Sequence, residues 1–250
     1  MFRGPEGKKN LLKIMAVVLI CLAILIGFRT FLDKKTEGKA EAGVTVENVI
    51  SQNNITIPEF DGETYVVEMN GNEPYFTDDE LKTEYFLELS DFDEYSRAQS
   101  AWMCADEEHI RTEKRDSDIS DLIPSGWKKN GIYQRSHLLM WKLSGPDDLK
   151  NLITGTEYFN QVCMLEYEEQ VTAYLWDNED VHVMYRVTPY YIDAEEVARG
   201  VLMEAYSVED EGEFQFCVFV YNAQPGSEIE YDSGIYHYYE DWEDALADAA

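Results

Sequence analysis

The chain has 250 residues, of which 45% are apolar and 13% aromatic, and it carries a formal net charge of −30 with a pI near 4.3. The apolar content suffices for a packed core, which excludes general disorder as the reason for the acidity. The length fits one domain of roughly 200 residues and one additional segment. The acidity excludes a surface that attracts nucleic acid through positive charge over its whole extent.

The basic residues are concentrated in two segments. Residues 1–40 contain eight Lys or Arg against three Asp or Glu, and residues 111–150 contain eight against six. The other 170 residues contain 4 basic side chains and 41 acidic ones. Residues 111–150 are therefore the only part of the expected folded domain that is not strongly negative, and contacts to an anion would concentrate there.

The N-terminus has the pattern of a membrane anchor. Ile14 to Phe28 is an uninterrupted apolar run of 15 residues, preceded by basic residues and closed by Arg29. This run is short for a bilayer span, but Leu11–Leu32 is long enough if the flanking basic side chains reach the interface. No small-residue cleavage pattern directly follows, so we expect residues 1–32 to be an uncleaved signal-anchor with a transmembrane helix, a cleaved signal peptide being the alternative.

The expected location follows from this anchor. Lys and Arg number four on each side of the apolar run, so charge does not decide the orientation. A long domain after a short basic N-terminus usually lies outside the cell. We therefore expect a single-pass protein of the cell membrane with an extracellular folded domain, or a secreted protein if the segment is cleaved.

The segment after the anchor is predicted as a linker followed by the first elements of the domain. Residues 33–54 are polar and lack aromatic side chains, which is typical of a linker. Thr64–Asn70 alternates as a strand and ends in a turn signal. Thr77 and Glu80 have the spacing of a capping box, which predicts a helix beginning there. Helix or loop is expected over Asp91–Ala105.

The rest of the domain, which we expect to span residues 55–235, is predicted mostly as strands. Strands are predicted at Gly131–Leu139, Val181–Thr188 (ended by Pro189), Val197–Ser207 and Glu213–Tyr221. Loops are predicted at Ile119–Lys129 and Gly145–Asp148, and a helix is predicted near Tyr158–Tyr174. Residues 236–250 are predicted to be a loosely attached acidic tail. Strands mixed with few helices, and not alternating regularly with helices as in βαβ units, predict an α+β fold with a mainly antiparallel central sheet.

One predicted strand carries residue types that suit phosphodiester hydrolysis. This reaction needs an activated water and neutralisation of the charge on the phosphate. His137 can accept the proton of water, and Arg135, on the same face of the strand, can pair with a phosphate oxygen. Asn160 offers an amide oxygen that suits Mg²⁺, and Glu168 can hold one of the waters around such an ion. An ordinary polar pair on a strand is the alternative, and the residues alone leave both interpretations open.

Several motifs in one order carry a family resemblance. Gln134-Arg-Ser-His-Leu-Leu139 is followed by Asn151-Leu-Ile-Thr-Gly-Thr-Glu-Tyr-Phe-Asn160 and by Met164–Glu168. Further matching runs are Pro74–Glu80, Thr112–Arg115, Tyr185–Pro189, Val197–Ala205 and Val220–Gly226. Over about residues 55–234, the chain resembles the DNA/RNA non-specific endonuclease family and, within it, the streptococcal DNA-entry nuclease branch.

The resemblance implies a ββα-metal finger and an enzyme that hydrolyses DNA, with RNA as an open alternative, leaving 5′-phosphates. It implies Mg²⁺ as the cofactor, with Mn²⁺ as an alternative, and no small-molecule cofactor; no protein partner is indicated. The resemblance implies His137 as general base, Asn160 as direct metal ligand and Glu168 as holder of metal-bound water. It implies Arg135 as phosphate contact, Asn151 as support of the site, and Arg115 and Lys114 as contacts to the substrate backbone.

The chain departs from the family's pattern at four positions. Gln134 stands where Asp or Asn is usual, which changes how the strand is braced. Glu157 stands where close relatives have Arg, Glu166 where Pro is usual, and Glu169 where Asn is common. These acidic residues would recruit cations, or weaken the binding of a polyanion and steepen its salt dependence. Two hypotheses stay open: an active nuclease, and a non-enzymatic surface module that binds a protein or metal ions.

Overall fold

The computed structural model describes residues 50–52, 55–129 and 131–239. The expected anchor lies outside the described residues, as do 33–49 and 53–54 of the expected linker and 240–250 of the expected tail. Across the described part of the chain, no helix has the length and apolar character needed to cross a membrane. The anchor at residues 1–32 therefore stays a prediction.

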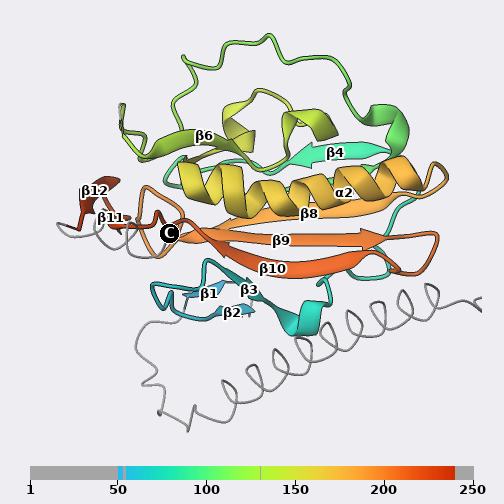
Figure 1. Cartoon of the computed structure of the whole chain (residues 1–250), viewed down its shortest axis with the longest axis horizontal. Coiled ribbons are helices and arrows are strands. Elements are labelled where there is room, and N and C mark those ends of the chain that lie inside the picture. Colours follow the sequence, from blue (N-terminus) through green and yellow to red (C-terminus); the bar gives the residue numbers. More distant parts are fainter. Residues whose placement is uncertain (1–49, 53–54, 130, 240–250) are drawn as a thin grey trace, which may run out of the picture. The chain divides into compact units, whose positions relative to one another are not determined.

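A six-stranded sheet forms the centre of the described domain (Figure 1). Its strands follow the order β3-β10-β9-β8-β5-β4, and every neighbouring pair is antiparallel. The strands are β3 (Val66–Glu68), β4 (Phe86–Leu89), β5 (Ala101–Ala105), β8 (Val183–Tyr190), β9 (Gly200–Ser207) and β10 (Gln215–Tyr221). The predicted α+β class and the mainly antiparallel sheet are confirmed.

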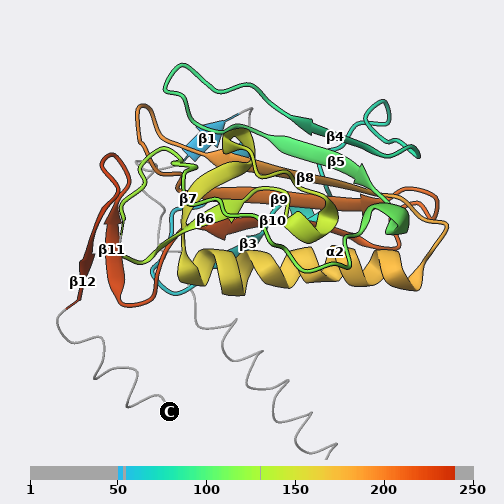
Figure 2. The ribbon, with the colours of Figure 1, turned by 90° about the horizontal axis from the view of Figure 1, so that it is seen from above.

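The sheet is buried on both faces because β8, β9 and β10 carry nearly continuous runs of buried side chains, and successive side chains point to opposite faces. On one face, Tyr185 lies in the same core cluster as Val171 of helix α2 (Leu165–Asp177). On the opposite face, Phe219 lies in a second cluster with Ile57. All four of these side chains are fully buried, and burial of Val171, Ile57 and Phe219 contributes about 1.5–3 kcal/mol of hydrophobic stabilisation each. Figure 2 shows α2 running alongside the strands, so the sheet provides a rigid base for this helix.

The helical segments other than α2 are short. They are the 3₁₀ turns η1 (Asn70–Asn72), η2 (Glu107–His109), η3 (Trp141–Leu143) and η4 (Leu149–Asn151), and the π-helix η5 (Phe159–Met164). The helix predicted near Tyr158–Tyr174 is confirmed, because η5 leads directly into α2. The strands predicted around β6 (Tyr133–His137), β8, β9 and β10 are confirmed as well.

Two small hairpins lie at the predicted domain borders. Strands β1 (Ile50–Gln52) and β2 (Ile55–Ile57) pair with each other, so ordered structure begins inside the segment predicted as a linker. Strands β11 (Ser227–Glu230) and β12 (Ile235–Tyr238) also pair. The tail predicted from residue 236 therefore begins inside a strand, and Tyr236 packs edge-on against Tyr133 with ring centroids 5.8 Å apart.

The helix predicted from the capping box is wrong, and only the Glu80 half of the box forms. The Thr77 backbone N–H donates to Glu80 Oε2 at 2.8 Å, and the Glu80 N–H donates to the Thr77 carbonyl at 2.9 Å. The other carboxylate oxygen of Glu80 accepts from Arg186 of the sheet at 2.9 Å. This long-range contact fixes a single turn, and the chain then continues into β4 instead of a helix.

The strand predicted to end at Pro189 continues to Tyr190. Beyond Val187, β8 pairs only with β9 and no longer with β5. The Tyr190 carbonyl accepts from the Arg199 N–H on the β9 side. The backbone of Pro189 therefore points toward the β5 side of β8, where β5 no longer pairs with β8. The missing N–H of proline therefore costs no hydrogen bond there.

Candidate active site

The predicted ββα finger is present. Strand β6 pairs antiparallel with β7 (Leu152–Thr156), and η5 and α2 follow immediately. In this pair, Gly155 lies opposite Gln134, and a Cβ at Gly155 would collide with Ser136 Oγ and the ring of Phe159. The glycine thus lets the beginning of the helix approach the strand pair closely. Figure 1 shows β6 next to α2.

Gln134 holds the side chain of Asn160. Asn160 Nδ2 donates to Gln134 Oε1 at 2.8 Å, and Gln161 Nε2 donates to the same oxygen at 2.9 Å. With its nitrogen engaged, the Asn160 amide presents Oδ1, to which no described residue donates a hydrogen bond. Asn160 also lies in a π-helical turn, a local geometry that is frequent at functional sites. The departure at position 134 therefore orients the residue that was predicted to bind the metal.

His137 is buried at the end of β6 and faces a carboxylate. Its side chain is 10% exposed, and its Nε2 lies 3.0 Å from Asp147 Oδ1. Burial lowers the pKa of His137 below its ordinary value, and the guanidinium groups of Arg115 and Arg111 lower it further, whereas Asp147 opposes the shift. The imidazole is consequently neutral at pH 7, which is the form that accepts a proton.

The two residues predicted to bind the substrate backbone differ in their surroundings. The Arg115 guanidinium pairs with Asp147, and its Nε donates to Ser117 Oγ at 3.0 Å. Ser117 Oγ donates in turn to Asp147. Lys114 is exposed and pairs with no acidic side chain among the described residues. The contacts therefore bring Arg115 into the surroundings of His137 and leave Lys114 in solvent.

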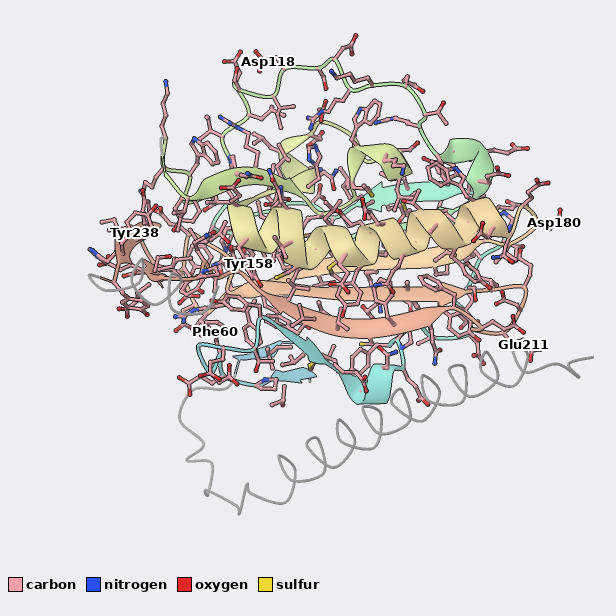
Figure 3. The ribbon with its side chains drawn as sticks, in the orientation of Figure 1. Phe60, Asp118, Tyr158, Asp180, Glu211 and Tyr238 are labelled. Carbon is pink, nitrogen blue, oxygen red and sulfur yellow. The ribbon has the colours of Figure 1, made fainter. Side chains whose placement is uncertain are left out.

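Arg135, predicted as a phosphate contact, braces a loop. Its Nε donates to the Leu122 carbonyl at 2.6 Å and one terminal nitrogen donates to the Ser120 carbonyl at 2.7 Å. The guanidinium also stacks 4.1 Å from the centroid of the Trp127 ring. Figure 3 shows the loop, marked by Asp118, beyond β6. A role of Arg135 toward phosphate stays a prediction, and the geometry shows a role in loop structure.

Asn151 fixes the backbone that follows His137. The side chain is fully buried. Its Nδ2 donates to the carbonyls of Leu139 and Pro146 at 2.9 and 3.0 Å, and its Oδ1 accepts from the Leu139 N–H at 2.9 Å. These bonds hold the end of β6 against the loop that carries Asp147. The hydrogen bonds of the Asn151 side chain therefore all go to backbone atoms, and none goes to the side chain of His137.

Glu168 is a buried carboxylate on α2, only 6% exposed. Thr172, one turn further along the same face, has its Oγ1 3.9 Å from Sδ of Met140, which lies just after β6. The face that bears Glu168 is thus turned toward the segment after His137. No described residue donates a hydrogen bond to the Glu168 carboxylate, and burial, with a smaller effect of Glu169, raises its pKa to about 8. Nearby positive charge, such as a hydrated cation, would stabilise its ionised form.

The acidic departures lie on the surface near Asn160. Glu157, Glu166 and Glu169 are all exposed. Glu166 and Glu169 line a shallow surface hollow together with Gln161, the residue that contacts Gln134. They therefore add negative potential beside the residue predicted to bind the metal. In the described part of the chain, no three or more His, Cys, Asp or Glu side chains are grouped so that they could hold an ion.

Sequence reasoning missed Asp147 and Ser117. Asp147 lies in the predicted turn Gly145–Asp148, where an aspartate is ordinarily explained by the turn itself. Its position ten residues after His137 was the only signal, and a contact across a loop cannot be derived from that spacing. No pattern in the sequence indicated that Ser117 would contact Asp147.

Comparisons with known proteins agree with this geometry. A family model described as DNA/RNA non-specific endonuclease matches residues 76–209, more than half of the chain. A deoxyribonuclease from Streptococcus dysgalactiae subsp. equisimilis is 33% identical over 147 residues, which cover 52% of this chain. The match spans only 44% of that relative's length.

Solved structures share the fold. NucA from Streptococcus agalactiae with a magnesium ion bound aligns with a TM-score of 0.61 at 22% identity, covering 69% of this chain and 86% of NucA. The Sda1 nuclease with a bound zinc ion aligns with a TM-score of 0.54 at 26% identity, covering 60% of this chain and 80% of Sda1. At 22% identity, the likeness to NucA is one of fold.

Proposed function

This chain belongs to the DNA/RNA non-specific endonuclease family, and from that premise we propose that it hydrolyses phosphodiester bonds in DNA, and in RNA as a second substrate, with Mg²⁺ as cofactor. One observation carries the proposal: a buried, neutral His137 ends the first strand of a ββα finger whose helix presents the oriented amide oxygen of Asn160.

His137 is the general base of the proposed reaction. Its imidazole takes a proton from water, the water oxygen bonds to phosphorus, and the P–O3′ bond breaks with its electron pair going to the 3′-oxygen. That oxygen then takes a proton from solvent, and the products carry a 5′-phosphate and a 3′-hydroxyl. The lowered pKa of His137 keeps the base unprotonated at neutral pH.

Asn160 and Glu168 are the residues that would hold the ion. An amide oxygen without a hydrogen bond and a buried carboxylate without a partner are hard oxygen donors, which suits Mg²⁺ with most of its waters retained. The ion would neutralise charge on the phosphate. Asn160 Oδ1 would bind it directly, and Glu168 would hold water of its hydration shell. NucA was solved with magnesium and Sda1 with zinc, so the family's fold accommodates either ion in those proteins.

The substrate would be bound through its phosphates. Lys114 is exposed in the one basic segment of the domain, and Arg115 lies beside it with 29% of its side chain exposed. Contacts to phosphates carry no direct sequence information, which agrees with cleavage at many sequences. The exposed Glu157 and Glu166 oppose the approach of a polyanion, so we expect activity to need Mg²⁺ well above the amount that fills one site, and to fall with added salt.

The location is proposed from the sequence alone. The basic N-terminus and the apolar run of residues 14–28 support an uncleaved anchor with the nuclease domain outside the cell. Cleavage of this segment would instead give a secreted enzyme.

The proposal is tested with the full chain and supercoiled plasmid DNA. Mg²⁺-dependent nicking and linearisation are expected, with cleavage abolished by EDTA and by His137→Ala. His237→Ala is the matched control, because this exposed histidine lies on β12 with 61% of its side chain in solvent. End-labelling of the products before and after phosphatase treatment identifies the 5′-phosphate. Plasmid left intact at low salt with Mg²⁺, Mn²⁺ or Zn²⁺ contradicts the proposal and favours a non-enzymatic surface module.

A further inference from the structure

We propose that Asp147 and His137 form a dyad in which Asp147 is a positioning residue: its carboxylate holds the proton on His137 Nε2 and thereby makes Nδ1 the atom that takes the proton from the attacking water. The catalytic part of this inference rests on the proposed function, whereas the proton position on the ring does not. Neither residue spacing nor the family resemblance had indicated a role for Asp147.

The position of the proton follows from the contact between the two side chains. His137 Nε2 lies 3.0 Å from Asp147 Oδ1. An ionised carboxylate only accepts hydrogen bonds, so Nε2 must carry the hydrogen. In a neutral imidazole the other nitrogen then has a free lone pair. No described residue hydrogen-bonds to His137 Nδ1, so this lone pair is available to water.

Asp147 is ionised and held from two sides. Burial alone would raise its pKa, but hydrogen bonds from Ser117 and His137, with the charge of Arg115, hold the pKa below the usual value for an aspartate. The Arg115 guanidinium and the Ser117 hydroxyl both donate to this carboxylate. The carboxylate therefore keeps its negative charge and one orientation at neutral pH.

The loop that carries Asp147 is fixed against the end of β6. Arg111 donates to the Gly145 carbonyl at 3.2 Å, and Asn151 donates to the Pro146 carbonyl at 3.0 Å. A Cβ at Gly145 would collide with the backbone carbonyl of Leu139, so only glycine lets the loop pack this closely. These contacts to the loop backbone thus place Asp147 near His137 independently of the hydrogen bonds that the Asp147 side chain itself makes.

Arg115 acquires a second role from this arrangement. Besides its proposed contact with the substrate, its guanidinium holds the carboxylate of Asp147. The opposite interpretation is that the carboxylate bridges Arg115 and His137 where a substrate phosphate would bind, and so blocks the site. The two interpretations predict opposite effects of removing the carboxylate charge.

The kinetic test uses Asp147→Asn in the full chain, with Asp148→Asn as the matched control. Asp148 is exposed, and its side chain caps η4 by accepting from the Lys150 N–H at 2.8 Å, which asparagine can also do. In Asp147→Asn, kcat for plasmid cleavage should fall on the order of 10- to 100-fold. The acid limb of the kcat/KM profile should move to lower pH, because Arg115 and Arg111 then face His137 without the opposing charge of Asp147.

Unchanged kcat and an unchanged pH profile in Asp147→Asn would overturn the dyad. A lower KM with undiminished kcat would also overturn it, because that result would show that the Asp147 carboxylate blocks the binding of substrate. Asp148→Asn should match the wild-type chain in both. A merely structural role would lower the amount of folded enzyme without moving the pH profile, and the unfolding midpoint of each variant measures that contribution.

A second measurement requires no turnover. The ¹⁵N shifts of the His137 ring in the metal-free chain report which nitrogen carries the proton. The Nε2–H tautomer is expected in the wild type, with mixed tautomers in Asp147→Ala. An Nδ1–H tautomer in the wild type overturns the dyad. A wild-type chain that shows the Nε2–H tautomer but cleaves no DNA contradicts the proposed function alone.

Discussion

Replacing Gln134 by alanine removes the acceptor that orients the Asn160 amide. The bond lost is the 2.8 Å contact from Asn160 Nδ2, and without it the amide can rotate away from the ion. A hydrogen bond of this kind contributes about 1 kcal/mol net, which corresponds to about a fivefold change in an equilibrium constant. We therefore expect the Mg²⁺ concentration for half-maximal cleavage to rise about fivefold in Gln134→Ala.

The assay is the initial rate of plasmid nicking as a function of Mg²⁺ at fixed ionic strength. The rate at saturating Mg²⁺ should stay within about twofold of the wild type, because an ion that fills the site restores the amide orientation. Gln161→Ala is the matched control: it removes the other donor to the same oxygen, at 2.9 Å, and leaves the Asn160 contact intact. An unchanged Mg²⁺ dependence in Gln134→Ala, or an equal shift in Gln161→Ala, would refute the reasoning.

Three further predictions concern the scaffold of the site. Burial raises the pKa of Glu168 to about 8, so the stability that the protonated carboxyl group contributes is fully present below the unfolded pKa near 4.5 and is lost as the pH rises through about 8. Glu168→Gln should therefore be more stable than the wild type at pH 8, by up to a few kcal/mol, but not at pH 4. Urea unfolding of both proteins at the two pH values checks this. Gly155→Ala forces a Cβ against Ser136 and Phe159 and should cost about 1–3 kcal/mol, seen as a lower unfolding midpoint; an undiminished midpoint would contradict the close approach. Arg135→Ala should speed proteolytic cleavage near Leu122, because the loop loses two hydrogen bonds and a stacked ring; a cleavage rate equal to that of Lys129→Ala, which alters an exposed side chain, would speak against a bracing role.

Local patterns in the sequence predicted much of the fold. The short apolar runs of β8, β9 and β10 are a property of neighbouring residues, and so is the apolar face that α2 buries through Val171 and Leu175. These elements were therefore predictable within a few residues. The ordered motifs around His137 also predicted the finger, through their resemblance to the motifs of the family.

Tertiary contacts decided the elements that the sequence did not predict correctly. Only the Glu80 half of the capping box at Thr77 formed; Arg186 of the sheet also engages Glu80, and no helix follows. Pro189 remained in its strand because the neighbouring strand had already ended. Tyr236 belongs to the folded part because its ring packs on Tyr133.

The side-chain contacts of the site were beyond prediction for the same reason. The partner of Asn160 is Gln134, 26 residues earlier, and the partner of His137 lies in a turn that local reasoning explains fully. Arg135 was expected to face phosphate, since period-two alternation places it on the same side as His137. The carbonyls of Ser120 and Leu122 engage its guanidinium instead, and no local pattern describes that loop.

The central claim, that this chain is a nuclease with His137 as its base, is tested most directly by chemical rescue. The measurement is plasmid cleavage by His137→Ala at saturating Mg²⁺, with and without added imidazole. A loss of roughly 10²- to 10⁴-fold is expected, with part of the rate restored by imidazole and the restored rate following the fraction of unprotonated imidazole. Cleavage by His137→Ala at the wild-type rate without imidazole would contradict the account.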